Sequence, residues 1–331
     1  MADREMGSEQ AQLKAIKPKE LRVGMYVHLP LAWYEHPFLK NHFLITSENQ
    51  IRKIHECGVK EVRIDPAQSR IRAETPPEPV PQAPKPPVLR TEDLMEAICD
   101  KKLPVEKKAQ AVHLHSLKMM KDLMENPTVE NIQQAKDGIA KVVDLILDDN
   151  ATNYHLLRIT SHDFNTYIHS VNVGVLSVSL AKLLFKRSDA HDMHALGGGF
   201  FLHDLGKVRI DLKIINKPAK LSDEEMREMK RHPDYGFQLL QETNQLNNEC
   251  KTIVLQHHER ENGTGYPQGL KGDEIHIYGR ICSVADVFEA LTSVRPYKKA
   301  LKPFDALRVM RDEMISHFHR DLFEQFVLLF A

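Results

Sequence analysis

The sequence predicts a mainly α-helical protein in which an all-helical domain follows a small domain of mixed α/β structure. Three observations support this prediction. The length of 331 residues exceeds the roughly 150 residues of an average domain, so about two domains are expected. A Pro-rich segment divides the chain. Most of the sequence after that segment repeats apolar residues at the spacing of an α-helix.

The first domain is expected over residues 1–75. Residues 23–29 and 59–64 have the composition of strands, and residues 47–57 between them have the pattern of a helix that Gly58 ends. No group of candidate catalytic side chains occurs in this segment. We therefore expect this domain to regulate the rest of the protein or to dock it.

Residues 76–90 are expected to form a linker. Seven prolines lie between residues 75 and 87. Such a composition favours an extended, solvated chain over packed structure. The domain boundary is therefore placed in this segment.

The helical region is expected over residues 91–331. Pro104 and Pro127 interrupt the helical pattern of its first part, and short loops are expected at residues 197–199 and 263–272, where glycine is frequent. The apolar C-terminal end of the chain is expected to pack against these helices or against a partner.

Charge and cysteine content exclude several classes of protein. Lysine and arginine number 45 and aspartate and glutamate 46, so the basic excess of a protein that binds nucleic-acid polymers is absent. The four cysteines form no C-x-x-C pair, which argues against a thiolate zinc site and a disulfide framework. The polar N-terminus and the lack of a run of about 18 apolar residues predict no membrane insertion. A cytoplasmic location is expected.

The sequence has 18 histidines but a single tryptophan, and the context of some of its histidines and aspartates is unusual. His203 and Asp204 follow an apolar triplet and precede Leu205, and Asp286 lies within an apolar helical stretch. A carboxylate buried there requires a metal or a charged partner. Two interpretations of Asp204 stay open, a metal ligand or an aspartate that pairs with Lys207 or caps a helix.

Four further histidines lie at helix faces or ends. His169 continues the apolar stripe of a long helix, where a single histidine is more often a core residue. His257 and His258 come together at a helix end, which favours a metal site. His232 falls between two helices, the first of which begins with a capping box at residues 222–225. Alone, His232 would be a surface residue.

Together these side chains supply five imidazoles and two carboxylates: His169, His203, Asp204, His232, His257, His258 and Asp286. Nitrogen and oxygen donors without sulfur suit Fe, Mn or Zn, whereas Ca²⁺ and Mg²⁺ prefer oxygen donors. Seven ligands exceed the needs of one tetrahedral site, and Asp204 could bridge two metals. Two metals about 3.5–4 Å apart form a device for phosphoester hydrolysis.

Over residues 160–331 the sequence resembles the HD-GYP family, a bacterial branch of the HD phosphohydrolases that includes cyclic di-GMP phosphodiesterases. The resemblance rests on His-Asp-Leu-Gly-Lys at 203–207 and on four further motifs, at residues 216–221, 231–236, 257–270 and 284–297. Residues 17–70 resemble a small domain often found before HD-GYP domains. The resemblance implies an HD-type metal-binding helical bundle.

The resemblance also implies a set of metal ligands. One metal would be held by His169, His203, Asp204 and Asp286, and the other by Asp204, His232, His257 and His258. Relatives with a third metal have a glutamate four residues before the first histidine. Asn165 occupies that position here, so two divalent metals are expected, with Fe or Mn as the candidates.

The resemblance also implies which residues are catalytic and which bind the substrate. Asp204 and Lys207 are expected to be catalytic, with Lys207 on the helical face of His203 and directed at the scissile phosphate. Tyr266, Arg295 and Lys298 are expected to contact the nucleotide. The alternative for Arg295 and Lys298 is an exposed pair at a helix end.

The function implied is bacterial second-messenger signalling through hydrolysis of cyclic di-GMP to pGpG, GMP or both, by hydroxide that two metals activate. Two alternatives stay open. One is hydrolysis of another cyclic dinucleotide such as 3′,3′-cGAMP, and the other is a catalytically silent sensor that signals through a protein partner. A protein partner or a homodimer is compatible with each of these functions.

Overall fold

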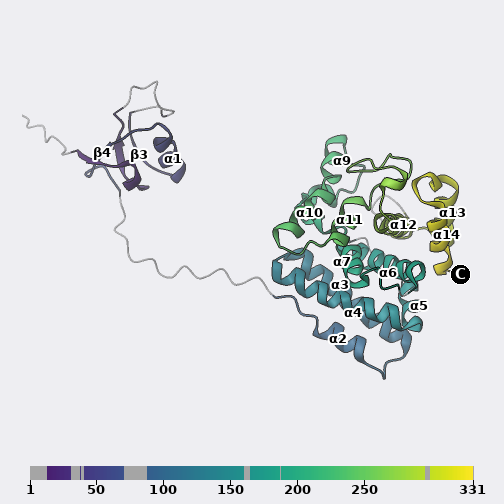
Figure 1. The fold of residues 1–331 in the computed structure, drawn as a ribbon. Coiled ribbons are helices and arrows are strands. Elements are labelled where there is room, and N and C mark those ends of the chain that lie inside the picture. Colours follow the sequence, from purple (N-terminus) through teal and green to yellow (C-terminus); the bar gives the residue numbers. More distant parts are fainter. Residues whose placement is uncertain are drawn as a thin grey trace, which may run out of the picture. The chain divides into compact units, whose positions relative to one another are not determined.

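The structure is a computed structural model, and it describes residues 13–30, 38, 41–70, 88–159, 165–186, 188–294 and 299–330. The chain divides into two compact units, Met1–Lys85 and Pro86–Ala331 (Figure 1). Most of the described residues are helical, and the strands lie in the first unit. The predicted fold class is therefore confirmed. The expected linker lies outside the described residues except for residues 88–90.

The first unit contains an antiparallel four-stranded sheet with the strand order β1-β4-β2-β3. Val27 at the centre of the sheet is opposite Phe43 on one side and Ile64 on the other. The hydrophobic core of this unit includes Val27, Ile45, Ile54 and Val62. The bounds of its elements are β1 Lys14–Ile16, η1 Pro18–Glu20, β2 Tyr26–His28, β3 His42–Leu44, α1 Glu48–Glu56 and β4 Val62–Asp65.

The predicted strands at 23–29 and 59–64 correspond to β2 and β4, and the predicted helix corresponds to α1. The strands β1 and β3 were not predicted. Each has three residues, as β2 does, but β2 lies within the longer stretch at 23–29 from which it was predicted.

The second unit begins with a group of helices that the proline positions delimit. Pro104 is the N-cap residue of α3, and Thr128, which follows Pro127, caps α4 by accepting a hydrogen bond from the Asn131 backbone N–H. The predicted interruptions at Pro104 and Pro127 are therefore confirmed. These helices are α2 Glu92–Cys99, α3 Val105–Glu125, α4 Val129–Asp148 and α5 Asn150–Arg158.

Two very apolar helices, α6 Thr166–Phe185 and α7 Met193–Leu202, form the centre of this unit. They lie between α3 and α4 on one side and α11 Asn248–Gln256 and α12 Ile277–Thr292 on the other (Figure 1). By length and mean hydropathy α6 could cross a membrane, although polar residues interrupt its apolar run and most of the helix is buried within the unit.

The prediction of a loop at residues 197–199 is wrong, because these three glycines lie inside α7. A Cβ on Gly197 would lie 2.3 Å from Val143 of α4, and one on Gly199 would lie 2.5 Å from Ile253 of α11. Gly197 and Gly199 therefore allow close packing of α7 between α4 and α11. Turn statistics from a single sequence do not distinguish glycines of this kind from a loop.

The remaining elements surround one end of α7 and α12. The C-terminal helix packs on α12, where the Phe288 ring lies 5.3 Å from that of Phe326 and 4.8 Å from that of Phe330. The expected packing of the C-terminal end is confirmed. These elements are η2 Leu205–Arg209, α8 Leu212–Ile215, α9 Asp223–Met229, α10 His232–Glu242, η3 Gly272–Glu274, α13 Pro303–Glu313, η4 Ile315–His317, α14 Arg320–Val327 and η5 Leu328–Phe330.

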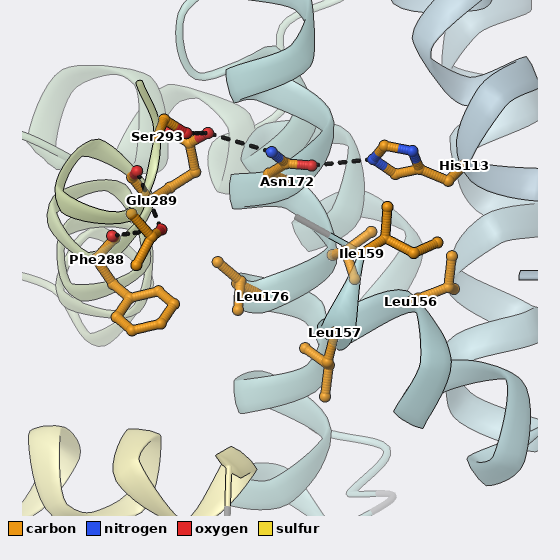
Figure 2. Close-up of a pocket in the computed structure, with 11 residues that line it drawn as sticks. His113, Leu156, Leu157, Ile159, Asn172, Leu176, Phe288, Glu289 and Ser293 are labelled. Atoms are coloured by element: carbon orange, nitrogen blue, oxygen red, sulfur yellow. Dashed lines mark hydrogen bonds between the residues drawn. The ribbon is translucent and has the colours of Figure 1, made fainter. Parts of the chain in front are cut away.

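A small cavity lies where α3, α5, α6 and α12 meet (Figure 2). Its volume is about 40 Å³, and its walls are mostly apolar side chains. Five polar side chains also line it: His113, Asn172, Glu289, Thr292 and Ser293.

Candidate metal centre and substrate groove

Five separate elements bring the predicted ligands together. His169 lies in the first turn of α6, and Asp286 lies in the middle of α12. His203 and Asp204 form the junction between α7 and η2. The remaining three lie at the ends of helices: His232 is the first residue of α10, and His257 and His258 come directly after α11.

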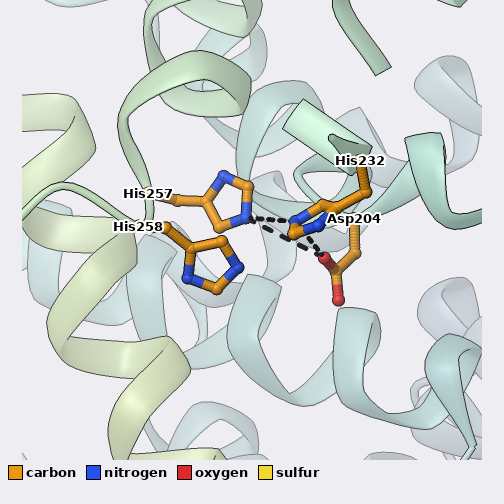
Figure 3. A group of neighbouring side chains, drawn as sticks. All are labelled: Asp204, His232, His257 and His258. Carbon is orange, nitrogen blue, oxygen red and sulfur yellow. Dashed lines mark hydrogen bonds and ion pairs between the residues drawn. The ribbon is translucent and has the colours of Figure 1, made fainter. Parts of the chain in front are cut away.

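The first group of side chains surrounds Oδ1 of Asp204 (Figure 3). His232 Nε2 lies 3.2 Å from this oxygen, and His257 Nε2 lies 3.8 Å from it. The two Nε2 atoms are 3.1 Å apart. Donor atoms of these three residues and of His258 all lie within 4.8 Å of one another, so they could hold one ion.

The second group surrounds the other oxygen of Asp204. His169 Nε2 lies 3.4 Å from Asp204 Oδ2 and 3.4 Å from His203 Nε2. Asp286 lies between the two groups, with one oxygen 3.0 Å from His169 Nε2 and the other 3.4 Å from His258 Nδ1. Asp204 is therefore the side chain that both groups share.

The hydrogen bonds of the imidazoles leave their lone pairs directed at the centre. The Nδ1 atoms of His203, His232 and His257 lie 2.7, 2.8 and 2.9 Å from the backbone oxygens of Phe200, Met229 and Val254. A carbonyl oxygen only accepts, so each Nδ1 donates, and a ring in this position that carries no second proton presents an Nε2 lone pair. Lone pairs and a carboxylate so close together repel one another unless a cation lies between them. The residues thus fit a metal.

The charge states of three of the histidines and of Asp204 agree with this fit. Burial lowers the pKa of His203 and His257 and lowers that of His258 to about 3, so these rings are neutral at neutral pH. Burial acts to raise the pKa of Asp204, but the Lys207 ammonium and the nearby histidines outweigh it and hold the pKa well below its usual range. Neutral imidazoles and an ionised carboxylate are the forms that bind metals.

Two positions in the site differ from the sequence-based predictions. His232 was expected between two helices, but it is the first residue of α10 and is buried. Lys207 was expected on the helical face of His203, but α7 ends at Leu202 and Lys207 lies in a 3₁₀ turn. From this turn the Lys207 ammonium forms an ion pair with Asp204. The pairing of these two residues that the sequence left open is therefore present within the histidine cluster.

Glu289 is a buried residue of the site that the sequence analysis missed. It accepts a hydrogen bond from Nδ1 of His169, which directs Nε2 of that ring at the centre. Burial acts to lower the pKa of His169, but Glu289 and Asp286 outweigh it and raise the pKa to about 10, so a metal held by this ring would displace a proton from it. The signal was a second acidic residue three positions after Asp286 in an otherwise apolar helix.

A groove with a volume of about 430 Å³ adjoins the histidines, a size usual for ligand pockets. Tyr266 lines it, and its ring stacks on that of His258 at 4.5 Å, with the Lys230 ammonium 5.3 Å away on the ring face. Burial raises the pKa of Tyr266, so its hydroxyl is a neutral donor. Arg295 and Lys298, the other predicted nucleotide contacts, lie outside the described residues.

Glu259, a second buried acid that the sequence analysis missed, holds the loop that carries Tyr266. Its carboxylate accepts backbone N–H bonds from Gln268, Gly269 and Leu270 at 2.7, 3.2 and 3.0 Å. The Tyr266 backbone N–H in turn donates to the His258 carbonyl at 3.2 Å. This loop is therefore tied to the histidines by backbone hydrogen bonds.

We expect Glu259→Gln to weaken substrate binding without removing metal. The amide keeps the size of the side chain, but its NH₂ group faces N–H donors and cannot accept from them. Loss of charge-assisted hydrogen bonds should loosen Tyr266 and raise KM about tenfold, equivalent to about 1.4 kcal/mol. Steady-state kinetics and metal analysis of the same preparation check this. An unchanged KM, or a loss of metal, would show that Glu259 does not act through the loop.

Comparison with known proteins gives two family matches. Residues 170–322 match a model described as an HD domain. Residues 13–145 match a model described as a domain of unknown function, DUF3391. The second match covers both the sheet and the helices α2 and α3.

Individual relatives cover much of the chain. A cyclic di-GMP phosphodiesterase of Pseudomonas aeruginosa is 34% identical over 325 residues, which are 95% of this chain and 76% of that protein. A 3′3′-cGAMP-specific phosphodiesterase of Vibrio cholerae is 37% identical over 146 residues, 44% of this chain and 31% of the relative. The solved structure of an HDG“Y”P protein from Bdellovibrio bacteriovorus matches the fold with a TM-score of 0.62 at 18% identity, over 97% of this chain and all of that one.

Proposed function

Because this chain belongs to the HD-GYP family of metal-dependent HD-domain phosphohydrolases, we propose that it hydrolyses cyclic di-GMP to pGpG and GMP. One observation carries the proposal: imidazole lone pairs converge on both oxygens of a buried carboxylate, Asp204, beside a groove of ligand size. Such a centre can hold cations beside a phosphodiester, as hydrolysis requires. A protein that only senses the nucleotide does not need such a centre.

We propose two divalent metals at this centre, with Fe or Mn as the candidates because the donors are nitrogen and oxygen. His169, His203, Asp204 and Asp286 would hold one metal. Asp204, His232, His257 and His258 would hold the other. Two such metals, when bound, polarise the phosphoryl oxygens and lower the pKa of a bound water.

The side chains of this chain would orient and neutralise the substrate. In the reaction, water adds an oxygen to phosphorus, the bond from phosphorus to the 3′ oxygen breaks, and a proton reaches that oxygen. Lys207 keeps a positive charge at the edge of Asp204, where it can meet a phosphate oxygen. Tyr266 offers a neutral hydroxyl and a ring face in the groove, for hydrogen bonding or for stacking on a base.

A second candidate substrate is 3′,3′-cGAMP. It is favoured by the similarity to a relative whose name gives that substrate. The metal centre would act on the phosphodiester of either nucleotide, because none of its ligands reads a base. Discrimination would therefore depend on the groove, where a base edge would meet side chains such as Arg260 and Lys230.

We expect protein loaded with Fe or Mn to convert cyclic di-GMP to pGpG and GMP, with a higher kcat/KM than for 3′,3′-cGAMP. Chromatography of the products, with both substrates side by side and a chelated sample as the control, checks this. A higher kcat/KM for 3′,3′-cGAMP would favour the second candidate. Bound but intact nucleotide in the presence of measured metal would contradict both and support a sensor.

We also propose a cytoplasmic location. The four cysteines are free thiols, as is usual in a reducing compartment. A cyclic dinucleotide substrate agrees with this location if it acts as a signal inside the cell.

A further inference from the structure

A chain of hydrogen bonds runs from the metal centre through the interior to helix α3. Figure 2 shows its part from Glu289 and Ser293 through Asn172 to His113. It begins at His169, whose Nδ1 contacts Oε2 of Glu289. The other carboxylate oxygen, Oε1, accepts from Asn172 Nδ2 at 3.2 Å and from the Ser293 hydroxyl at 2.5 Å. Both carboxylate oxygens of Glu289 therefore accept hydrogen bonds within this chain.

Asn172 is held from its far side by His113 of α3. Its amide oxygen lies 3.0 Å from His113 Nε2, and because an amide oxygen only accepts, this nitrogen donates. The two ends of the amide thus have opposite roles: the NH₂ group serves the carboxylate and the oxygen serves the imidazole. A reversed amide would set its oxygen against the Glu289 carboxylate, acceptor to acceptor, so the amide bonds Glu289 and His113 together in this orientation.

Three of the groups in this chain are shielded from water, and Asn172 is half-buried. His113, Glu289 and Ser293 are buried, with exposed fractions of 8, 3 and 3%. Burial lowers the pKa of His113, so its ring is neutral and donates through a single nitrogen. In such surroundings an unpaired polar group costs free energy. The loss of one hydrogen bond therefore also weakens the next bond of the chain.

The adjoining cavity gives Glu289 space to take another position. Its volume of about 40 Å³ exceeds the ~10–15 Å³ that one water needs, and the same polar side chains line it. Close packing on every side would hold the Glu289 carboxylate in place without hydrogen bonds. Because one side faces a cavity, the hydrogen bonds have to hold it. Partners that orient a ligating histidine commonly change metal affinity 10–100-fold when removed.

We propose that His113 and Asn172 are positioning residues for the metal centre: they hold Glu289 against His169 and so set the affinity of the metal site that contains His169. The inference rests on the proposed metal-dependent function. His113 lies outside the residues that match the HD domain and inside those that match the domain of unknown function. Helix α3, which precedes the HD-domain match, thus supplies a part of the metal centre's surroundings. A movement of α3 would therefore change the position of Glu289 and, through His169, the metal affinity.

The test uses full-length protein freed of metal and titrated with Mn²⁺ by calorimetry. We expect His113→Leu and Asn172→Leu, which keep a side chain branched at Cγ but remove the hydrogen bonds, to weaken one of two Mn²⁺ sites at least about tenfold. His113→Gln, which can offer an N–H donor, should restore much of the affinity. Thermal unfolding of the metal-free proteins is measured in parallel.

The matched control is Ser179→Ala, on the same helix as Asn172. The Ser179 hydroxyl is also buried and bonds Asn153 of α5 at 3.0 Å, but it does not lead to Glu289. It should lower thermal stability without changing Mn²⁺ affinity. If His113→Leu does not fold, the comparison of Mn²⁺ affinity between Asn172→Leu and Ser179→Ala tests the inference.

Wild-type affinity in both leucine variants would overturn the inference while leaving the proposed function intact. Equal weakening in Ser179→Ala would also overturn it, because the effect would then be one of general stability. A wild-type protein that binds no Mn²⁺ and hydrolyses no cyclic dinucleotide with Mn²⁺ or Fe²⁺ would overturn the proposed function and the inference with it.

Discussion

Asp204→Asn should abolish hydrolysis of cyclic dinucleotides and reduce the bound metal to less than one ion per chain. Asp204 offers one oxygen to each group of histidines, so the substitution removes a donor that two sites share. An amide has one oxygen and no charge. Because loss of an outer partner already costs about 10–100-fold, loss of this ligand should cost more than about a hundredfold in kcat. Turnover and metal content of the purified proteins check this.

The sequence provides a matched control in another His-Asp pair. Asp192 follows His191 and caps α7 by accepting the Ala195 backbone N–H at 2.9 Å. Asparagine caps helices about as well as aspartate, so Asp192→Asn should keep activity, metal and stability. If Asp204→Asn retained the full rate, or two bound metals, the shared role of Asp204 would be refuted.

Gly206→Ala should destabilise the helical unit and open the metal centre. A Cβ at this position would lie 1.9 Å from the His232 carbonyl oxygen and 2.3 Å from the Gly236 backbone nitrogen, and neither backbone atom can rotate away. Helix α10 would have to move off η2, which separates His232 from Asp204. We expect a loss of about 1–3 kcal/mol in the free energy of unfolding and loss of one metal. Urea unfolding and metal analysis measure the two effects.

The control for this prediction is Gly198→Ala in α7. A Cβ there would lie 3.7 Å from Cys250 Sγ and 3.8 Å from Lys136 Cε, which are ordinary contacts. Alanine within a helix is favoured over glycine by about 1 kcal/mol, so this variant should be at least as stable as the wild type. Equal stability of both variants, each with two metals, would show that η2 and α10 can separate without consequence.

Much of the candidate site could be predicted because its residues conflict with their immediate neighbours. A His-Asp pair after Phe200 and Phe201, or an aspartate inside an apolar helix at 284–288, is anomalous in any sequence. Helix boundaries at Pro104, Pro127 and the capping box at 222–225 are local signals, and the structure has each of them. Local signals of this kind need no knowledge of distant contacts.

The rest depends on contacts that the sequence does not reveal. Glu289 has its role through His169, which lies 120 residues away along the chain, and a single sequence offers no means of pairing them. The three glycines of α7 have the composition of a loop until Val143 and Ile253 are known to press on the helix. The two short strands of the sheet are defined by their pairing partners rather than by a pattern of their own.

The dispersal of the ligands over five elements has a consequence for the whole helical unit. Residues from 169 to 286 meet at one point, so bound cations would act as cross-links between segments that are far apart in the chain. A ligand that binds only the folded state adds about 2.7 kcal/mol to stability at a hundred times its dissociation constant. Metal supply would then govern the lifetime and abundance of this protein as well as its turnover, and a cell short of metal would lose the molecule along with the activity.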